Sequence, residues 1–358
     1  MRMTLLLFIV FLISNILSGS PAEARSVDNH PSVGAIRWDG WFAGSSWQKN
    51  LQSKEWQNRL PFYTKTGADG IITVIEDSQE VMDKEIVYAS RAGIDYWAFC
   101  YYHPKSWSEA DSYNYGWKRY LASKYKSKLN FCLLLQWGHL GPKDEWDETI
   151  KRFISMFKEP TYQRVSNGRP LIYFFNWDYM EKQFGSIPDA RKAIDELRTA
   201  SLKAGTGNPY IVAQVFAAAD GTKYIDELGF DAIGAYSAPM GNEHREYSYS
   251  ELADSNKWYW NSFRATDKKV VPLVNAGWDG RPRDYPGGWY ASPKPVELAQ
   301  NLRSAFDWLK QNPDATDADT VLIYAWNETD EGGWLVPTLS EGTKRLDAIQ
   351  SVLSRYKR

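Results

Sequence analysis

The sequence contains few of the residues that build metal centres and disulfide frameworks. Its 358 residues include 2 cysteines and 4 histidines, and the histidines are scattered rather than grouped at ligand spacing. We therefore predict no metal site. Cys100 and Cys132 each lie in an apolar, strand-like run. Burial as small hydrophobic side chains is favoured for both, although neighbouring strands would also permit a disulfide.

An excess of charge of either sign is also missing. Lysine and arginine total 42 against 44 aspartates and glutamates, for a net charge of -2, and no basic tract stands out. The charge pattern gives no reason to expect a nucleic-acid partner.

No apolar run is long enough to cross a membrane comfortably. The first residues instead have the three parts of a secretory signal peptide, which are Arg2, the apolar residues 5–16 and the Ala-Glu-Ala sequence at 22–24. We predict that residues 1–24 direct export, to the periplasm or the medium, and that residues 25–358 have no stable membrane insertion. An uncleaved anchor is the alternative.

Aromatic residues, in contrast, are abundant, with 17 Trp, 22 Tyr and 15 Phe. Large rings often fill a core, but core packing alone does not require tryptophans near the ends of so many predicted strands. These are Trp38, Trp41, Trp137, Trp177, Trp278, Trp326 and Trp334.

Strand-like and helix-like segments alternate along residues 25–358. The predicted strands are Val33–Asp39, Asp95–Tyr102, Asn130–Trp137, Pro170–Trp177, Tyr210–Phe216, Asp231–Tyr236, Lys269–Trp278 and Thr320–Asn327. The predicted helices are Val81–Ala92, Lys118–Lys126, Trp146–Phe157, Asp189–Ala204, Thr222–Leu228, Glu251–Phe263, Val296–Gln311 and Gly342–Tyr356. Eight such units predict an α/β protein with a single (β/α)8 TIM barrel domain. A doubly wound open sheet is the rival, but its glycine-rich phosphate fingerprint does not follow the first strand.

Long loops follow four of the strands, at residues 40–54, 103–116, 237–248 and 279–295. Loops after strands form the active-site face of this barrel, and their size suggests an open cleft for an extended ligand. Polar and aromatic residues also gather at the strand ends, where planar rings and hydrogen-bonding groups together are typical of sugar recognition. The candidate substrate-binding residues are Trp38, Asp39, Tyr101, Tyr102, His103, Gln136, Trp137, Asn176, Trp177, Gln214, Tyr236, Trp278, Arg281, Trp326, Asn327 and Trp334.

The segment at residues 322–334 carries the clearest chemical signal. An apolar strand ends in a loop with three carboxylates, two glycines and flanking tryptophans. Glu328 and Glu331 have i,i+3 spacing, so both could face one substrate, and paired carboxylates are what glycoside hydrolysis uses. Alternatively, Asp330 and Glu331 solvate a loop or begin a helix.

The late segment Trp326-Asn327-Glu328-Thr329-Asp330-Glu331-Gly332 resembles the Trp-Asn-Glu-Trp-x-Glu-Gly element of glycoside hydrolase family 99. Related proteins include family 71 and the family 99-like domains of polysaccharide gene clusters. The opening segment at residues 33–42 is similar to that family's first strand, with Arg37 in place of an aromatic. In the late segment Thr329 replaces the usual aromatic residue and Asp330 follows it.

The resemblance covers nearly the whole mature chain and implies a (β/α)8 barrel. It implies Glu331 as general acid/base and Glu328 as the group that assists attack by the substrate's 2-hydroxyl, through a 1,2-anhydro sugar with net retention. That hydroxyl must be free and trans to the leaving group, as in α-mannosides, α-rhamnosides and β-glucosides.

The residues themselves leave other schemes open. Asp279, at the end of the seventh predicted strand, could pair with Glu328 as nucleophile or base while Glu331 acts as acid, and Asp39 is a further candidate. Charged residues of the long loops could contact uronate or sulfate groups, although solvated loop charges are the favoured interpretation. These are Arg281, Arg283, Lys105, His103, His244 and Arg245.

We therefore expect an exported glycoside hydrolase that acts on a polysaccharide or oligosaccharide, in an endo and retaining manner, as a monomer without a cofactor. One rival is a glycan-binding barrel that does not cleave its ligand. Another is a polysaccharide lyase in which Tyr101, Tyr102 or His103 removes a proton beside a uronate.

Overall fold

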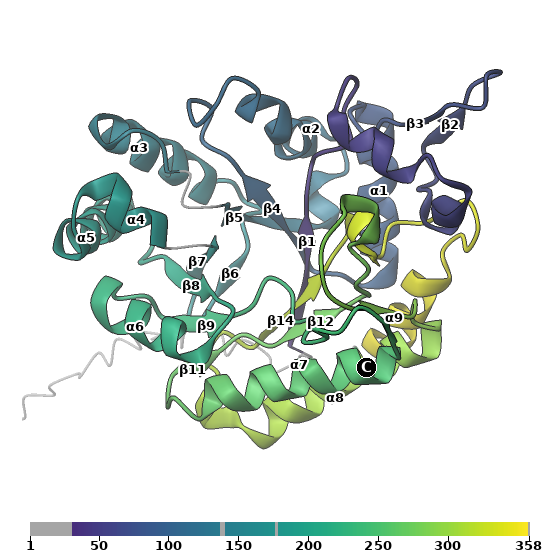
Figure 1. The fold of residues 1–358 in the computed structure, drawn as a ribbon. Coiled ribbons are helices and arrows are strands. Elements are labelled where there is room, and N and C mark those ends of the chain that lie inside the picture. Colours follow the sequence, from purple (N-terminus) through teal and green to yellow (C-terminus); the bar gives the residue numbers. More distant parts are fainter. Residues whose placement is uncertain (1–30, 137–139, 176–177, 357–358) are drawn as a thin grey trace, which may run out of the picture.

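The computed structural model describes residues 31–136, 140–175 and 178–356. Its central sheet is parallel and has the strand order β11-β9-β8-β7-β5-β4-β1-β14-β12. These strands are β1 (Ser32–Arg37), β4 (Tyr96–Tyr101), β5 (Asn130–Leu135), β7 (Arg169–Phe175), β8 (Tyr210–Gln214), β9 (Ala232–Gly234), β11 (Lys269–Val270), β12 (Leu273–Asn275) and β14 (Thr320–Tyr324). The first and last strands of this order, β11 and β12, are two halves of one strand position. The sheet therefore closes, and the predicted (β/α)8 barrel is confirmed (Figure 1).

The seventh strand position, expected as one continuous strand, is divided at a proline. β11 pairs with β9, whereas β12 pairs with β14. Pro272 between them has no N–H to donate, but its carbonyl oxygen accepts a hydrogen bond from the Leu322 N–H at 3.0 Å. The residues before the proline therefore pair with β9, and those after it pair with β14.

Helices surround the barrel (Figure 1). They are α1 (Gln79–Ala92), α2 (Tyr115–Ala122), α3 (Trp146–Phe157), α4 (Asp178–Phe184), α5 (Ile187–Lys203), α6 (Ala218–Leu228), α7 (Tyr249–Arg264), α8 (Pro295–Gln311) and α9 (Lys344–Leu353). All eight predicted helices are confirmed within a few residues at each end, and α4 is an addition. α1 and α6 end at Gly93 and Gly229, whose φ angles of 84° and 69° are left-handed and suit glycine.

The loops before and after the barrel strands contain further short elements. Pairs of short strands are β2 (Thr64–Thr66) with β3 (Ile72–Val74), β10 (Glu246–Tyr247) with β13 (Trp289–Tyr290), and β15 (Asn327–Glu328) with β16 (Gly333–Trp334), while β6 (Arg164–Val165) pairs with β7. The 3-10 helices are η1 (Ser46–Leu51), η2 (Lys54–Arg59), η3 (Ala110–Asn114), η4 (Lys126–Lys128), η5 (Lys143–Glu145), η6 (Arg281–Arg283), η7 (Pro313–Ala315) and η8 (Thr329–Glu331). The β10–β13 pair joins the loop after β9 to the loop after β12, so two distant segments form one wall.

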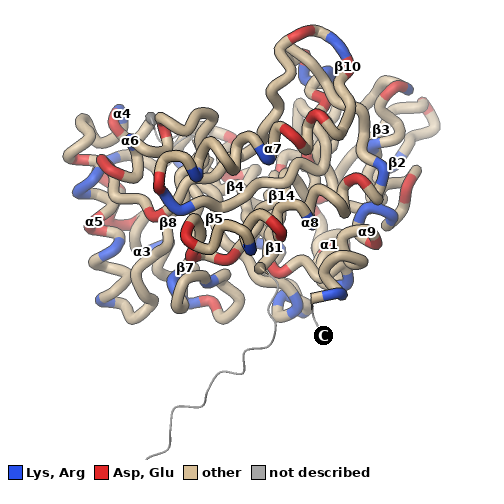
Figure 2. Tube along the Cα trace, turned by 90° about the horizontal axis from the view of Figure 1, so that it is seen from below, with Lys and Arg blue, Asp and Glu red and all other residues tan. Residues whose placement is uncertain are grey.

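Charged residues of both signs are mixed along the described chain rather than separated into faces (Figure 2). Within the same residues, none of the helices combines the length and apolar character that a membrane crossing needs. Cys100 and Cys132 are buried free thiols.

Candidate active site

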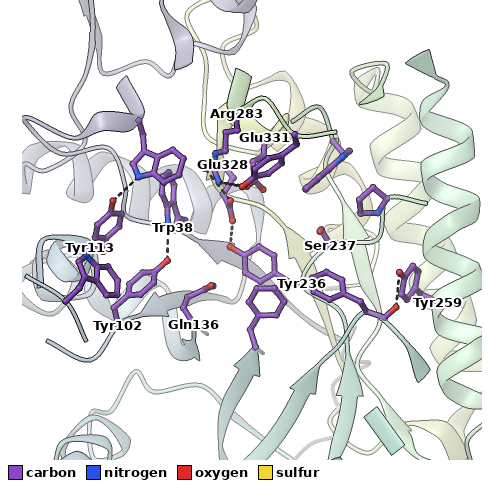
Figure 3. Close-up of a pocket in the computed structure, with 17 residues that line it drawn as sticks. Trp38, Tyr102, Tyr113, Gln136, Tyr236, Ser237, Tyr259, Arg283, Glu328 and Glu331 are labelled. Carbon is purple, nitrogen blue, oxygen red and sulfur yellow. Dashed lines mark hydrogen bonds and ion pairs between the residues drawn. The ribbon is translucent and has the colours of Figure 1, made fainter. Parts of the chain in front are cut away.

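A cavity of about 580 Å³ lies at the carboxyl ends of the strands (Figure 3). All four of the long loops expected from the sequence contribute to its wall. The lining residues are Trp38, Trp47, Tyr102, Trp107, Tyr113, Gln136, Phe175, Phe216, Tyr236, Ser237, Pro239, Tyr259, Trp278, Arg283, Tyr285, Glu328 and Glu331. Most of this wall is aromatic, and its charged groups are two carboxyls and one guanidinium.

Glu328 and Glu331 reach the cavity from one tight turn. Glu328 ends β15, the 3-10 helix η8 follows, and Gly332 with φ 79° turns the chain back into β16. Because residues three apart in a 3-10 helix lie above one another, both carboxyls face the same space (Figure 3).

Glu331 accepts hydrogen bonds at both carboxyl oxygens. Arg283 Nη1 and the Tyr285 hydroxyl, at 3.2 Å, donate to Oε1, and the Tyr324 hydroxyl donates to Oε2. The side chain is only 7% exposed. Its carboxyl is therefore held in one orientation before any ligand arrives.

Glu328 has a different environment. The Tyr236 hydroxyl donates to its Oε1 (Figure 3), and Arg283 Nη2 is 3.8 Å from its Oε2. Burial raises the pKa of Glu328 well above its usual range, and the neighbouring Glu331 charge adds to the rise although Arg283 opposes it. The Glu328 carboxyl thus favours its protonated form beside Glu331.

Arg283 connects three acidic side chains at this edge of the cavity. Its guanidinium donates to both oxygens of Asp330, at 2.7 and 2.8 Å, and also to Glu331. The same group lies over the rings of Trp38 and Trp47, 4.6 Å from each centroid. We name Arg283, Glu328, Asp330 and Glu331 the open cluster, because two of its carboxyls face the cavity.

One wall of the cavity is a hydrogen-bonded aromatic group. Trp38 Nε1 donates to the Tyr102 hydroxyl at 3.2 Å, and Trp47 Nε1 donates to the Tyr113 hydroxyl at 2.8 Å. The Trp38 and Trp47 rings meet edge to face, with centroids 5.4 Å apart. With its indole N–H groups already bonded, this wall offers a ligand ring faces more than donors.

Seven of the predicted site residues line the cavity. They are Trp38, Tyr102, Gln136, Tyr236, Trp278, Glu328 and Glu331. Trp137, Asn176 and Trp177 lie outside the described residues.

Asp279 is not among the lining residues. Arg59 Nη2 donates to its Oδ2, and Arg281 donates to Oδ1 from Nε at 2.9 Å and to Oδ2 from Nη2 at 2.8 Å. Burial alone would raise the pKa of Asp279, but the hydrogen bonds from Arg281 and the charge of Arg59 lower it. Asp279 and Arg281 therefore form an ion pair within one loop, and Arg59, which the sequence did not single out, joins that loop to η2.

Asp39 belongs to a second arginine cluster beneath the cavity. Arg37 forms ion pairs with Asp39 at 3.0 Å, Glu76 at 2.9 Å and Glu85 at 2.9 Å, and all four side chains are 0% exposed. Burial raises the pKa of Asp39 to about 8, even though the charge of Arg37 opposes the rise. We name Arg37, Asp39, Glu76 and Glu85 the sealed cluster.

Trp326 and Asn327, also predicted to contact substrate, instead attach the turn that carries Glu328 and Glu331 to the sealed cluster. Trp326 Nε1 donates to Glu85 at 2.9 Å, and Asn327 Nδ2 lies 3.0 and 3.1 Å from the two Glu76 oxygens. Asn327 also exchanges hydrogen bonds with the Trp38 backbone, at 2.6 and 2.9 Å. Both side chains therefore position the residue that follows them, Glu328.

The remaining predictions miss the cavity because their side chains point elsewhere. The Tyr101 hydroxyl accepts from Arg152 at 2.9 Å, among the outer helices. His103 is 1% exposed, and its Nδ1 accepts the Lys105 N–H at 3.2 Å. Trp334 is buried under Arg345, 3.7 Å from its ring.

Gln214 is buried inside the barrel, and neither its side-chain oxygen nor its nitrogen has a hydrogen-bonding partner. It does not line the cavity, although it ends β8 as expected.

The other loop cations considered for anionic substrates already have partners. Lys105 pairs with Glu145, Arg245 with Glu243 and Glu251, and Arg281 with Asp279 and Glu55. His244 lies 3.3 Å from the Gly287 carbonyl oxygen. These internal contacts leave no cluster of loop cations directed into the cavity.

Several site residues were given another role from the sequence or were not named at all. Arg283 was expected as a loop charge, but it organises the open cluster, and Tyr285 and Tyr324 bond to Glu331. The aromatic content of the long loops was the available signal for lining residues such as Trp47 and Tyr113. Their pairing across distant loops has no local sequence pattern.

Comparison with solved structures supports the fold. A glycoside hydrolase-like protein superimposes with a TM-score of 0.62 at 13% identity, covering 94% of this chain and 97% of that chain. The GH99 endo-alpha-mannosidase from Bacteroides thetaiotaomicron gives a TM-score of 0.61 at 12% identity, covering 91% of this chain and 98% of that chain. Its complex with BIS-TRIS-Propane gives 0.60 at 13% identity, with 91% and 97% covered. The expected resemblance to the family 99 clan is confirmed at the level of the fold.

Comparison with curated protein sequences gives no match. A family model described as glycosyltransferase WbsX matches residues 113–349, which include η8 and most of the barrel. The chain therefore belongs to the WbsX glycosyltransferase family.

Proposed function

We propose that this protein is a retaining glycoside hydrolase that cleaves bonds within an oligosaccharide or polysaccharide. The observation that carries the proposal is the pair Glu328 and Glu331, two carboxyls facing one aromatic-walled cavity at the carboxyl ends of a barrel. Aromatic rings suit the apolar faces of pyranoses, and the carboxyls suit proton transfer at a glycosidic oxygen.

The two carboxyls have different surroundings, and we assign them different steps of the reaction. In the scheme that the family 99 resemblance implies, Glu331 protonates the leaving oxygen and Glu328 takes the proton of the 2-hydroxyl. The raised pKa of Glu328 favours the protonated form of this carboxyl in the free protein. Since Glu331 is its nearest acidic neighbour in the turn, passing that proton to Glu331 would prepare both groups at once. Arg283 would then stabilise whichever carboxyl is charged.

Glycosyl transfer is a second candidate, favoured by the description of the family to which the chain belongs. A retaining site that activates the anomeric carbon can deliver the sugar to another sugar's hydroxyl in place of water. A nucleotide-diphosphate donor fits less well, because the guanidinium in the cavity wall is already bonded to Asp330 and Glu331. Transfer between glycans is the version that the cavity supports.

Export through residues 1–24 completes the proposal, since it would bring the protein into contact with extracellular or periplasmic polysaccharides. Determining the N-terminal sequence of the protein recovered outside the cytoplasm would test this. A mature chain beginning near residue 25 is expected, and an intact N-terminus on a membrane-bound protein would contradict cleavage.

The central experiment incubates the protein with α-mannans, rhamnose-containing polymers, β-glucans and uronic or sulfated polysaccharides. New reducing ends, ultraviolet absorbance and transfer products are followed together, with and without an oligosaccharide acceptor. Reducing ends without absorbance, lost in Glu328→Gln and Glu331→Gln and kept in the control Asp39→Asn, are expected. Absorbance from unsaturated sugars would indicate a lyase, and longer products with acceptor present would indicate a transferase.

Product stereochemistry tests the retaining mechanism separately. The anomeric configuration of the first product, followed by proton NMR, should match that of the substrate. Inversion would contradict the intermediate and would require a water between the two carboxyls.

A further inference from the structure

An exposed aromatic surface extends the cavity away from the carboxyls. Phe216, which follows β8, has 54% of its surface exposed although its ring lines the cavity. Tyr259 on α7 lines the same cavity at its far side from Trp38 (Figure 3). An exposed phenylalanine is costly to leave in water, so this position is suited to a ring that a ligand covers.

A continuous series of rings connects this surface to Glu328. The Tyr236 hydroxyl donates to Glu328, and the Tyr236 ring stacks on Phe175 with centroids 4.6 Å apart. Phe175 in turn meets Phe216 edge to face at 5.6 Å. Phe216 therefore lies two ring contacts from Tyr236, the residue that bonds to Glu328.

The outer part of this surface is fixed in position. The Tyr259 hydroxyl donates to the Phe216 carbonyl oxygen at 3.2 Å, which links the segment after β8 to α7. α7 is itself held by a capping box between Ser248 and Glu251. A ring surface that is already ordered loses little conformational entropy when a ligand binds.

The charges of the cavity indicate what kind of ligand fits. Its charged lining residues are Arg283, Glu328 and Glu331, and Arg283 also neutralises Asp330. Around Phe216 and Tyr259 the other lining residues are Ser237 and Pro239, which carry no charge. Among the described lining residues a uronate or sulfate would meet no unpaired cation, so an uncharged sugar is favoured.

We propose that the exposed Phe216 ring, held in place by the buried Tyr259, forms an outer subsite that stacks on an uncharged pyranose ring of the substrate, beyond the unit on which Glu328 and Glu331 act. This inference rests on the proposed function and narrows it to neutral oligosaccharides and polysaccharides. An enzyme with such a subsite gains binding energy from chain length, which a substrate of one sugar unit cannot supply.

The test compares Phe216→Ala with Trp258→Ala. Trp258 is a matched control, because it is 53% exposed and contacts Tyr259 at 5.2 Å but does not line the cavity. The probes are aryl glycosides of one sugar and oligosaccharides of increasing length from the neutral polymer that the wild type cleaves. Phe216→Ala should lower kcat/KM about tenfold on the longer oligosaccharides and leave the aryl glycoside unchanged, since stacking of this kind is worth about one factor of ten. Trp258→Ala should leave both unchanged.

Three results would overturn the subsite. These are equal losses on short and long substrates, equal losses in the two variants, or a change in oligomeric state on size-exclusion chromatography, which would make Phe216 an interface residue. Binding of the same oligosaccharides to the Glu331→Gln variant, measured by calorimetry with and without Phe216→Ala, separates this inference from the proposed function. If the wild-type protein shows no hydrolysis, binding that depends on Phe216 would support the subsite while refuting the hydrolase.

Discussion

The protein contains two clusters with the same composition, one arginine with three carboxyls, that differ in their access to solvent. In the sealed cluster Arg37 pairs with Asp39, Glu76 and Glu85, and every side chain is 0% exposed. In the open cluster Arg283 contacts Asp330, Glu331 and Glu328, and the two glutamates line the cavity. The same charges therefore form a structural support in one place and a candidate catalytic centre in the other.

A single stretch of chain joins the two clusters. Trp326 and Asn327 bond to the sealed cluster, and Glu328 enters the open one immediately afterwards. The buried network thus fixes the first residue of the turn, and the turn then presents Glu328 and Glu331 on one side. Buried ion pairs are poor evidence for stability in themselves, but here they determine where a carboxyl that lines the cavity can lie.

The largest expected effect is a loss of turnover on substitution in the open cluster but not in the sealed cluster. Glu331→Gln should lower turnover about a thousandfold or more, as expected when an acid/base group is lost, while Glu85→Gln in the sealed cluster should retain turnover within a few fold. Initial rates on the polymer identified above give the measurement, with circular dichroism as the check on folding. Similar losses in both variants would mean that the clusters act as one unit.

The next largest effect is a difference in how much the arginine of each cluster contributes to the free energy of unfolding. Arg37→Met leaves three buried carboxyls without their cation, which should lower the free energy of unfolding by about 3–5 kcal/mol. Arg283→Met should cost about 1–2 kcal/mol, because water from the cavity can solvate the carboxyls that it leaves, yet it should reduce activity severely. Urea unfolding and rate measurements on both variants test the pair, with Arg283→Lys as the charge-preserving control. A reversed order of stabilities would contradict the distinction.

Much of this contrast could not be predicted from the sequence. The eight strands followed from apolar runs and alternation with helices, but the division of the seventh strand at Pro272 was not predicted. Glu328 and Glu331 were identified because a strand end and an i,i+3 spacing are local features. Successive side chains along a strand point to opposite faces, so a difference of one position decides whether a residue at a strand end faces inward. Thus Tyr102 lines the cavity, whereas its neighbour Tyr101 bonds to Arg152 among the helices.

Arg283 shows why the remaining site residues could not be predicted from the sequence. It contacts Asp330 and Glu331, 47 and 48 residues further along the chain. That pairing depends on how two loops fold over each other, and no periodicity of the sequence records it. Asp279 shows the same limit, since one of its two arginine partners, Arg59, is 220 residues away in the chain. Asp39 instead pairs with Arg37, two residues away, and only the fold shows that both are buried.

A smaller expected effect is a pH dependence of stability that comes from Asp39 in the sealed cluster. The pKa of Asp39 is raised from 3.8 to about 8, so between those values the folded state binds more protons than the unfolded state. The free energy of unfolding should therefore be highest at the acid end of this window and fall as pH rises towards 8. The asparagine side chain in Asp39→Asn does not titrate, so the free energy of unfolding of this variant should fall less steeply as pH rises. Parallel curves for the two proteins between pH 5 and 9 would show that Asp39 does not titrate in this window.

The smallest effects concern the two tyrosines that hold Glu331 in the open cluster. The Tyr324 hydroxyl is buried and the Tyr285 ring is 41% exposed, yet both donate to the same carboxyl. Tyr285→Phe should lower kcat/KM only a few fold, since water can replace an exposed donor, whereas Tyr324→Phe should lower it about tenfold, because the lost hydrogen bond is worth about 1 kcal/mol or more in a dry site. The pH profiles of the two variants should differ in the same order. Equal effects would show that water reaches both oxygens of Glu331, which would remove the distinction between its buried and exposed sides.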